Sequence, residues 1–206
     1  VPIANHLTEA GVVAVKADSP YKTIEELVAA AKEKGNLKAS TNGNKASNHT
    51  AAQLLAKSAG FKYKAIPYGG TADQLLALRQ GEVDFTCAKV ADVAKLVKGD
   101  KPELRVLAVF NTKRDPELPN VPTLGEKGLY PEWYGSARAL VAPKGTNPEV
   151  IQYYVEAFKK TMQDPAVIEA HKKAGMALDF KDNKELGDLI KAQDKFARDV
   201  VNDLYK

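Results

Sequence analysis

The stretch STNGNKASNH, residues 40–49, follows a short apolar run and leads into a segment with helical spacing. A second stretch, PYGGTAD at residues 67–73, has the same position between a strand-like and a helix-like run. Gly, Asn and small hydroxyl residues of this kind form tight loops that turn backbone N–H groups toward one point. Such N–H groups bind anions together with the positive end of a helix dipole. The two stretches therefore predict a pair of loops that hold a carboxylate.

Strands and helices alternate through the first half of the chain. The runs expected to form strands are residues 12–15, 37–41, 63–68, 83–88 and 104–110. Thr23 and Glu26 have the capping-box spacing at the start of the first helix, which is expected to end at Gly35. The alternation recurs about every 20–25 residues and predicts a parallel α/β sheet, in which ligands lie beyond the carboxyl ends of the strands. Both loops and Lys89 fall at such ends.

The second half of the chain has a different pattern. Residues 111–131 form a connection interrupted by prolines, and residues 137–142 are expected to form a strand. The tail is mostly helical, with one short strand at residues 177–180 and a long helix at residues 184–205. These helices need a sheet to pack on, so they either pack on the first lobe or belong to a second lobe whose other strands lie outside this chain.

Composition excludes several classes of protein. The 206 residues are 44% hydrophobic, and the net charge of +4 comes from interspersed acidic and basic residues, which argues against nucleic-acid binding. No apolar run has the length of a membrane span. A single cysteine, Cys87, excludes an intrachain disulfide, and the scattered His6, His49 and His171 do not predict a metal site. The sequence has no phosphate-binding glycine motif, and we expect no cofactor.

Several segments in order along the chain resemble one family. They are DSP at residues 18–20, PYGG at 67–70, GEVD at 81–84, LRVLAV at 104–109, KR at 113–114, LPNVPT at 118–123, WYG at 133–135 and APKGT at 142–146. Together they resemble the substrate-binding proteins of tripartite tricarboxylate transporters, the Bug-type periplasmic solute receptors. The resemblance implies an α/β fold of the type II periplasmic-binding-protein kind, with two lobes and a hinge.

The resemblance also implies a domain organisation. Residues 18–134 would form a complete ligand-binding lobe. Residues 1–17 and 135–206 would supply the hinge strands and the C-terminal part of the second lobe, whose N-terminal part is expected to lie outside this chain. We therefore expect the 206-residue piece alone to bind carboxylates weakly or not at all.

The function implied is that of a monomeric extracytoplasmic receptor, periplasmic and either secreted or lipid-anchored. It would bind a mono-, di- or tricarboxylate by hinge closure and deliver it to the membrane permease subunits of a tripartite tricarboxylate transporter, with no catalysis. Two alternatives stay open. One is a carboxylate-sensing receptor that acts on a signalling partner. The other is a hydrolase that uses Cys87 and His49, for which Cys87→Ser would abolish turnover.

Candidate ligand-binding residues come from the two loops and the adjoining strand ends. They are Thr41, Asn42, Gly43, Asn44, Lys45, Ser47, His49, Tyr68, Gly69, Gly70, Thr71, Asp73, Lys89 and Trp133. The family usually has a Gly-Ser pair where this chain has Lys45 and Ala46, which leaves the contacts of the first loop open. Ser47 or Asn44 is expected to cap the helix that follows.

Each candidate side chain also has a structural interpretation. His49 either packs or caps in its helix or contacts the ligand. Tyr68 is either a half-buried strand residue or a hydroxyl donor to a carboxylate. Asp73 either caps its helix or accepts from a ligand hydroxyl, and Lys89 is either solvated or contributes charge. Trp133 either lines the cleft or packs at the hinge.

Overall fold

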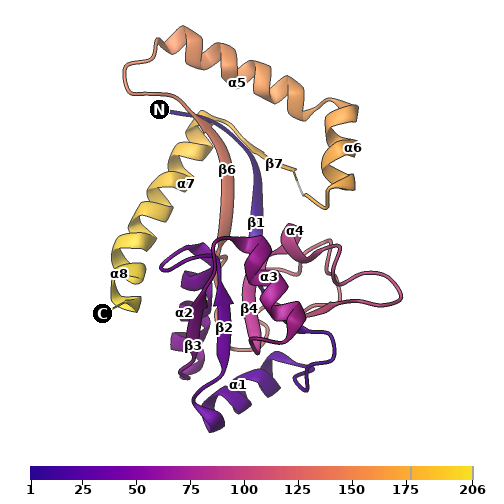
Figure 1. Ribbon diagram of the computed structural model, residues 1–206. Coiled ribbons are helices and arrows are strands. Elements are labelled where there is room, and N and C mark those ends of the chain that lie inside the picture. Colours follow the sequence, from indigo (N-terminus) through magenta and orange to yellow (C-terminus); the bar gives the residue numbers. More distant parts are fainter. Residues whose placement is uncertain (177, 206) are drawn as a thin grey trace. The chain divides into compact units, whose positions relative to one another are not determined.

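The computed structural model describes residues 1–176 and 178–205 and divides into two compact units (Figure 1). Unit 1 comprises Val1–Glu9 and Ala137–Lys206, and unit 2 comprises Ala10–Ser136. The chain passes between the units twice, within strand β1 (Pro2–Lys16) and within strand β6 (Gly135–Val141).

Besides its part of β1, unit 2 contains α1 (Ile24–Lys34), β2 (Lys38–Thr41), α2 (Ser47–Ala59), β3 (Lys64–Pro67), α3 (Thr71–Gln80), β4 (Phe85–Lys89), α4 (Val90–Val93) and β5 (Leu104–Phe110). The strands of this unit form a sheet in the order β3-β2-β4-β1-β5. β2 is parallel to β3 and β4, whereas β1 is antiparallel to β4 and β5. The α/β fold is confirmed, and the sheet is mixed: the crossover helices α2 and α3 make their strands parallel, and β1 enters in the opposite direction.

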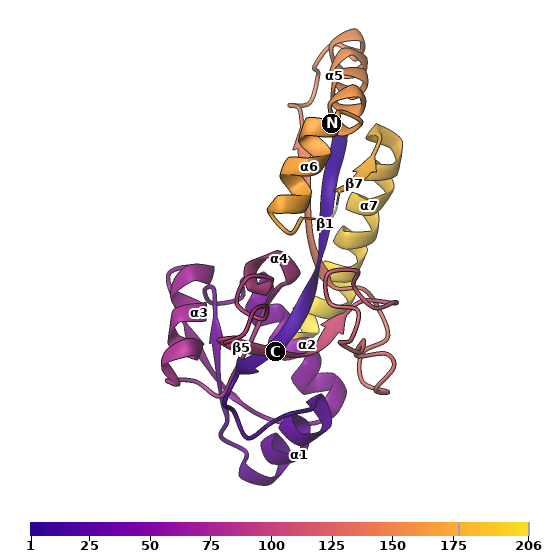
Figure 2. The same ribbon diagram turned by 90° about the vertical axis from the view of Figure 1, so that its right-hand side faces the viewer.

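Helices cover both faces of this sheet. α3 and α4 pack on one face, where Leu78 and Val93 join Val12 and Ala14 of β1 in one hydrophobic cluster. α1 and α2 lie on the opposite side of the sheet from α3 (Figure 2). All five residues of β4 are buried, including the polar Thr86 and Lys89, as expected for a strand covered on both faces.

Local signals determine where the helices of unit 2 begin and end. Thr23 Oγ1 accepts from the Glu26 backbone N–H, and Glu26 Oε2 accepts from the Thr23 backbone N–H, so the predicted capping box is confirmed. Gly35, Gly60 and Gly81 end the three helices in the left-handed conformation, which glycine adopts without steric cost.

Unit 1 is built on a smaller sheet, in which β1 pairs with β6 and with β7 (Leu178–Lys181). Its helical elements are α5 (Pro148–Met162), α6 (Pro165–Lys173), α7 (Asn183–Phe196), a π-helical turn η1 (Ala197–Val201) and α8 (Asn202–Leu204). The predicted short strand at residues 177–180 corresponds to β7, although Ala177 lies outside the described residues. Ile3 and Ala4 of β1 pack with Ile151 and Val155 of α5 in a small core. No helix within residues 1–176 and 178–205 has the length and apolar character needed to cross a membrane.

Candidate functional site

Three strand ends of unit 2 converge on one edge of its sheet. Thr41 pairs with Pro67 and Ser40 with Thr86, in parallel register, so β2, β3 and β4 all end at this edge. The Tyr68 backbone N–H donates to the Thr41 carbonyl oxygen at 2.9 Å, which joins the two predicted loops directly. The structure therefore places both loops next to one another at carboxyl strand ends, where open α/β sheets bind ligands.

The helix that follows the first loop, α2, is stabilised at its N-terminus by a residue other than those predicted. The N-cap of α2 is Ala46, which makes no side-chain cap hydrogen bond. Instead, Asn42 Oδ1 accepts from the Asn48 backbone N–H at 3.3 Å. The prediction that Ser47 or Asn44 caps α2 is wrong, because the loop turns back far enough for Asn42 to reach the first helical turn.

Lys45 and His49 hold the shape of this loop. Lys45 has φ 58, a left-handed conformation uncommon for a residue with a side chain, and Gly43 also has a positive φ of 126. The Lys45 backbone N–H donates to His49 Nδ1 at 2.9 Å, and the His49 residue is only 7% exposed. Burial lowers the pKa of His49, which favours the neutral ring that accepts this hydrogen bond. This contact supports the structural role for His49, and its contact with a ligand stays a prediction.

The second loop begins α3 with glycine at the cap. Gly70 is the N-cap, and the first intrahelical hydrogen bond runs from the Gln74 N–H to the Gly70 carbonyl oxygen at 3.1 Å. The N–H groups of Thr71, Ala72 and Asp73 precede that bond, at the positive end of the helix. The Asp73 carboxylate lies close to Gly69, since a Cβ built on this glycine would be 3.3 Å from Asp73 Oδ2.

The Tyr68 hydroxyl already has a hydrogen-bond partner on a neighbouring residue. Its hydroxyl donates to Glu82 Oε2 at 3.0 Å, so a bound carboxylate would compete with Glu82 for this donor. Asp84, in the turn before β4, accepts from the Lys38 backbone N–H at 2.7 Å and thereby joins this turn to β2.

Lys89, the last residue of β4, is 4% exposed, so of its two interpretations the solvated one does not hold. Its Nζ donates to Asn48 Oδ1 at 2.6 Å and to Ser47 Oγ at 3.4 Å. Both acceptors lie in the first turn of α2. Lys89 thus connects the end of β4 to the start of the helix that follows the first loop.

A buried polar network continues from this contact. Asn48 Nδ2 donates to Gln74 Oε1 at 2.9 Å, and Gln74 Nε2 donates to the Cys87 carbonyl oxygen at 2.6 Å and to Thr86 Oγ1. The network joins α2, α3 and β4, and therefore the supports of both loops. Sequence reasoning missed Asn48 and Gln74. The available signal was helical spacing, because Gln74 lies on the same face as the buried Ala77 and Leu78.

The residues before β6 also reach the first loop. The Tyr134 hydroxyl donates to the Ser47 carbonyl oxygen at 3.1 Å, and the Tyr134 ring packs at the edge of Phe110. Trp133 is half-buried and packs against the hydrophobic cluster beneath α3, which supports its packing role. Its contact with a ligand stays a prediction.

The environment of Cys87 argues against a thiol nucleophile. The side chain is fully buried in β4, and burial raises the pKa of the thiol to about 12. A nucleophilic cysteine needs a depressed pKa and access to substrate. The structure therefore disfavours the hydrolase alternative.

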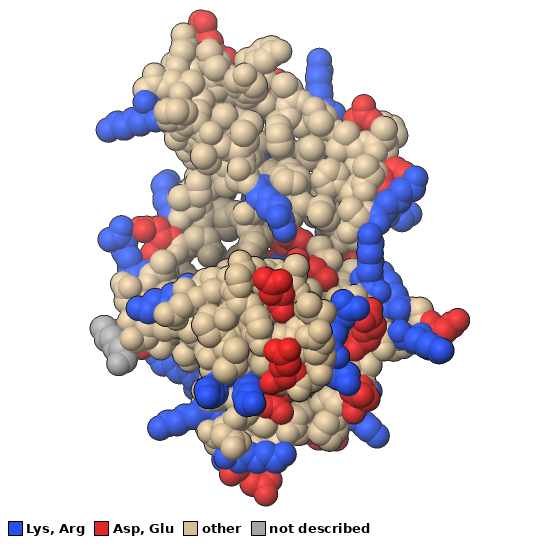
Figure 3. Space-filling view, in the orientation of Figure 1, with Lys and Arg blue, Asp and Glu red and all other residues tan. Residues whose placement is uncertain are grey.

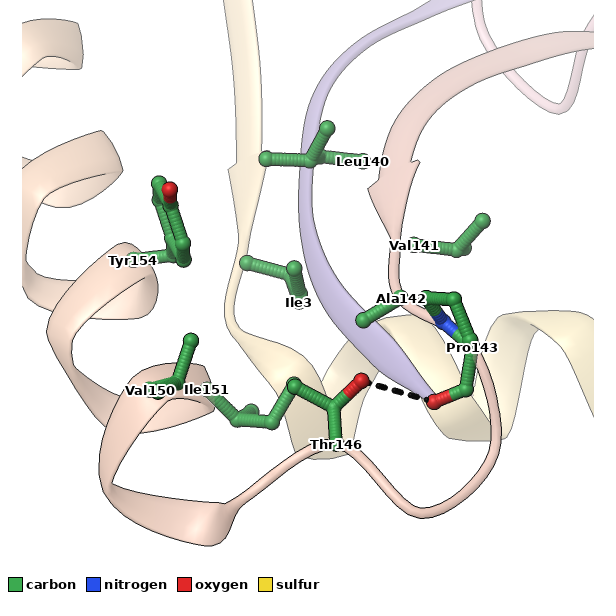
Figure 4. A pocket seen from close by; sticks show the side chains of 9 residues that line it. All are labelled: Ile3, Leu140, Val141, Ala142, Pro143, Thr146, Val150, Ile151 and Tyr154. Carbon is green, nitrogen blue, oxygen red and sulfur yellow. Dashed lines mark hydrogen bonds between the residues drawn. The ribbon is translucent and has the colours of Figure 1, made fainter.

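Unit 1 has a hollow of its own, of ≈ 370 Å³ (Figure 4). Its lining comes from β1, β6, α5 and the β6–α5 connection and consists of Ile3, Leu140, Val141, Ala142, Pro143, Thr146, Val150, Ile151 and Tyr154. Thr146 Oγ1 donates to the Pro143 carbonyl oxygen at 2.9 Å. This lining is aliphatic and aromatic without charged groups, which does not suit a carboxylate.

The surface of unit 2 carries both signs of charge. Figure 3 shows acidic and basic side chains interspersed over the visible face of this unit. Exposed ion pairs such as Arg79–Glu103 and Arg114–Glu126 account for part of this pattern. The visible face thus has no broad basic area of the kind that binds nucleic acid.

The chain matches the family model of the tripartite tricarboxylate transporter family receptor, TctC, over residues 1–204. The chain belongs to this family. A UPF0065 protein from Cupriavidus necator is 38% identical over 152 residues, which are 73% of this chain and 45% of that protein. A UPF0065 protein from Pseudomonas sp. strain P51 is 31% identical and matches 94% of this chain and 57% of its own length. Protein BugT of Bordetella pertussis is 29% identical over 72% of this chain and 45% of its own length. The chain spans about half the length of these relatives.

Several solved structures share the fold. A TctC solute-binding protein from Polaromonas, solved without ligand, has a TM-score of 0.83 and 28% identity, covering 98% of this chain and 69% of that one. The protein Rpa4515 of R. palustris, solved with adipate, has a TM-score of 0.84 and 21% identity over 96% of this chain and 67% of its own. MatC of Rhodopseudomonas palustris, solved with bound malate, has a TM-score of 0.73 and 24% identity, covering 86% of this chain and 60% of that one. The resemblance to TctC and Bug-type solute receptors is confirmed, as is the fold.

Proposed function

We propose that this chain is part of an extracytoplasmic receptor that binds a small carboxylate at the loops after β2 and β3. The proposal rests on one observation: a TctC-family chain in which two helices begin side by side at adjoining strand ends. Backbone N–H groups at helix N-termini bind carboxylates without a dedicated arginine. The adipate and malate bound by the two R. palustris proteins support dicarboxylates as the first ligands to test.

In this proposal the loop residues divide into those that would contact the ligand and those that hold the loops. The proposed ligand contacts are Thr41, Gly43, Asn44, Lys45, Ser47, Tyr68, Gly69, Gly70, Thr71 and Asp73. Asn42 and His49 would act mainly by fixing the first loop through their contacts with Asn48 and Lys45. Trp133 and Lys89 would act from beneath the loops.

We further propose that unit 2 is a ligand-binding lobe and that unit 1 forms part of a second lobe. The unit boundaries fall inside β1 and β6, so two strand segments connect the units, as a hinge requires. Exposed aliphatic side chains on β6 and α5 support a further packing partner for unit 1. Closure of the lobes around the ligand would then present the receptor to permease subunits of a tripartite transporter, on the outer side of the membrane.

A thermal-shift titration of the complete gene product tests the proposal. A ligand that binds only the native state raises the free energy of unfolding by about 2.7 kcal/mol at 100 times its dissociation constant. We expect malate, adipate or another small carboxylate to raise the melting temperature, and the corresponding diamides to leave it unchanged. A flat response to mono-, di- and tricarboxylates would overturn the proposal.

One substitution tests whether the ligand binds at the loop before α2. Ser47→Asp puts a carboxylate at the first turn of α2, where it stabilises the helix dipole but repels a ligand anion. We expect it to abolish the ligand-induced shift while the ligand-free protein stays folded. Ser58→Asp is the control at the exposed far end of the same helix, where it also removes the hydrogen bond that the Ser58 hydroxyl donates to the Leu129 carbonyl oxygen. Equal responses of the two variants would remove the site from the α2 loop.

A further inference from the structure

Unit 2 has a hollow of ≈ 430 Å³ between the ends of α1 and α2. Both helices end in the same sequence pattern, an alanine and a lysine followed by two further residues and a glycine. The glycines, Gly35 and Gly60, are left-handed, and their N–H groups donate to the carbonyl oxygens of Ala31 and Ala56. The two helices thus end beside one another in small residues, which leaves the space between them open.

The lining of this hollow combines an apolar floor with positive charge. Phe61 and the two alanines are buried. The charged lining residues are all exposed lysines: Lys32, Lys57 and Lys62. Within residues 1–176 and 178–205, none of these three lysines takes part in an ion pair. An apolar centre surrounded by polar groups is the usual anatomy of a protein–protein interface. We call this feature the basic hollow.

The positive charge at this end of unit 2 exceeds what the helices need. Lysines in the last turn of a helix stabilise its dipole, which accounts for Lys32 and Lys57. This reason does not apply to Lys62, which follows α2, or to the exposed Lys38 and Lys64 at the starts of β2 and β3. Lys38 and Lys64 are also partners in the strand register, where like charges repel.

Nearby acidic groups offset only part of this charge. Glu33 lies between two lysines of α1 in the sequence. Asp84 accepts from the Lys38 backbone N–H at 2.7 Å, so its carboxylate already has a neighbour. The lysines at this end therefore outnumber the carboxylates, and the surface favours an acidic partner.

The basic hollow and the ligand loops lie at opposite ends of unit 2. β2 and β3 run parallel, begin beside the hollow and end at the two loops. Figure 1 shows α1 and the start of β2 at the lower end of the unit. A partner bound at the basic hollow would therefore leave both loops open to a ligand.

We propose that the basic hollow is a docking surface for a protein segment that carries an apolar side chain between carboxylates. The apolar side chain would fill the floor, and the carboxylates would pair with the lysines around it. The role of this partner, an acidic loop of a permease subunit, rests on the proposed function. The docking surface itself is independent of it.

The shape and the surroundings favour a protein segment over other anionic partners. Binding to a bilayer surface normally uses exposed aromatic or large aliphatic side chains. Within the described residues, the ends of α1 and α2 expose none of these. A small free anion on the floor would face the C-terminal ends of two helices, which carry partial negative charge.

Titration of the complete gene product with labelled peptides tests the inference by fluorescence anisotropy. The probe is the peptide Asp-Glu-Leu-Glu-Asp. Its neutral analogue Asn-Gln-Leu-Gln-Asn is expected to bind at least about 10-fold more weakly, because it lacks the charges. Replacing the central leucine by glycine is expected to weaken binding at least about threefold, because the floor then stays unfilled. Equal binding of the acidic and neutral peptides would overturn the inference.

Two combined variants locate the binding surface. The first neutralises the lysines of the basic hollow by Lys32→Gln, Lys57→Gln and Lys62→Gln. The control neutralises three exposed lysines of unit 2 outside the hollow by Lys22→Gln, Lys101→Gln and Lys113→Gln. We expect the first variant to bind the acidic peptide roughly 10-fold more weakly and the control to stay within about twofold. Equal weakening in both would overturn the inference, because it would show attraction by net charge alone. All six positions are exposed, and circular dichroism checks that both variants fold.

Two further measurements separate this inference from its alternatives. Phosphatidylglycerol vesicles that bind more tightly than the peptide, and lose binding in the first variant, would assign the surface to a bilayer and overturn the inference. Calorimetry with malate and adipate separates it from the proposed function. We expect the first variant to bind them as the unmodified protein does. If the unmodified protein binds no carboxylate, the proposed function fails and the peptide result still decides on the docking surface. If it binds malate but not the acidic peptide at about 5 mM, only the docking inference fails.

Discussion

Strand β4 in unit 2 and strand β6 in unit 1 both mix apolar and polar residues, and they have opposite surroundings. All five residues of β4 are buried, whereas the last five residues of β6 are exposed. Val141 is 58% exposed and Tyr153 on α5 is 69% exposed, while Phe85 on β4 is fully buried. Helices on both faces enclose the sheet of unit 2, and no such cover lies over β6 in the described part of unit 1. Apolar side chains on a strand are stabilised by burial, and the elements packed around the strand decide whether they are buried.

The two units also differ in how they accommodate buried polar groups. Unit 2 holds Asn48, Gln74 and Lys89 in one hydrogen-bonded network between its helices and its sheet. Unit 1 holds the buried Glu9 through an ion pair with Arg138, whose Nε donates to Glu9 Oε2 at 2.9 Å. A network with several partners loses more when one member is removed, because each partner is then left without its hydrogen bond.

The largest expected effect comes from the core of unit 2. Phe85→Ala removes a fully buried ring in contact with Phe61 and Tyr63, and we expect it to lower the free energy of unfolding by about 3–5 kcal/mol. Tyr153→Ala in unit 1 is the control and should change it by less than about 0.5 kcal/mol. Urea denaturation followed by circular dichroism measures both. Similar losses in the two variants would mean that the face of α5 is covered in solution, which would break the comparison of the units.

The next effect concerns the polar network. Gln74→Leu keeps the volume of the side chain but leaves Asn48 Nδ2 and the Cys87 carbonyl oxygen without their partner, so we expect a loss of about 2–3 kcal/mol. Gln80→Leu, at the exposed end of the same helix, is expected to be near neutral. The fluorescence of Trp133, the single tryptophan, reports unfolding of unit 2 in urea. A neutral Gln74→Leu would show that the network contributes little to stability.

A smaller effect is expected at the ion pair of unit 1. Arg138→Met leaves the Glu9 carboxylate buried without its cationic donor and should cost about 2 kcal/mol. Lys195→Met removes an exposed partner of Asp199 and should cost less than about 0.5 kcal/mol. If Arg138→Met is as mild as Lys195→Met in urea denaturation, water solvates Glu9 in place of the arginine.

The smallest effect is a change with pH. Burial lowers the pKa of His49 below its ordinary 6.5, so the folded protein binds fewer protons than the unfolded chain just below that pH. The corresponding stability is present above about pH 6.5 and is lost as the pH falls through the folded-state pKa. We expect His49→Asn, whose Oδ1 can still accept from the Lys45 N–H, to reduce this acid loss by less than about 1 kcal/mol between pH 7 and 5.

His6 offers the matched test in unit 1. Burial is also the main cause that lowers the pKa of His6, opposed by its hydrogen bond with the Arg138 carbonyl oxygen. His6→Asn should therefore reduce the acid loss in the same direction, measured from urea midpoints across the same pH range. An unchanged pH dependence in both variants would assign the acid sensitivity of this chain to groups other than these two histidines.

Much of unit 2 could be predicted because its signals are local. Thr23 and Glu26 lie within one helical turn of each other, and Gly35, Gly60 and Gly81 each end a helix by their own backbone conformation. The positions of the two loops followed from the same signals, since each loop lies between a strand and a helix. The cap of α2 was missed because Asn42 reaches Asn48 only after the chain has folded back over the loop.

The sequence by itself determined the α/β class, the capping box of α1, the glycine ends of α1, α2 and α3, the resemblance to TctC receptors and the placement of both loops at strand ends. Only the tertiary structure decided that β1 runs antiparallel to β4 and β5, that Lys89 is buried beside α2 and that β6 remains exposed. The physical reason is the separation along the chain over which each effect acts. Capping, turn formation and periodicity act over a few residues, whereas burial and strand direction depend on segments that are far apart in the chain and meet only in the folded protein.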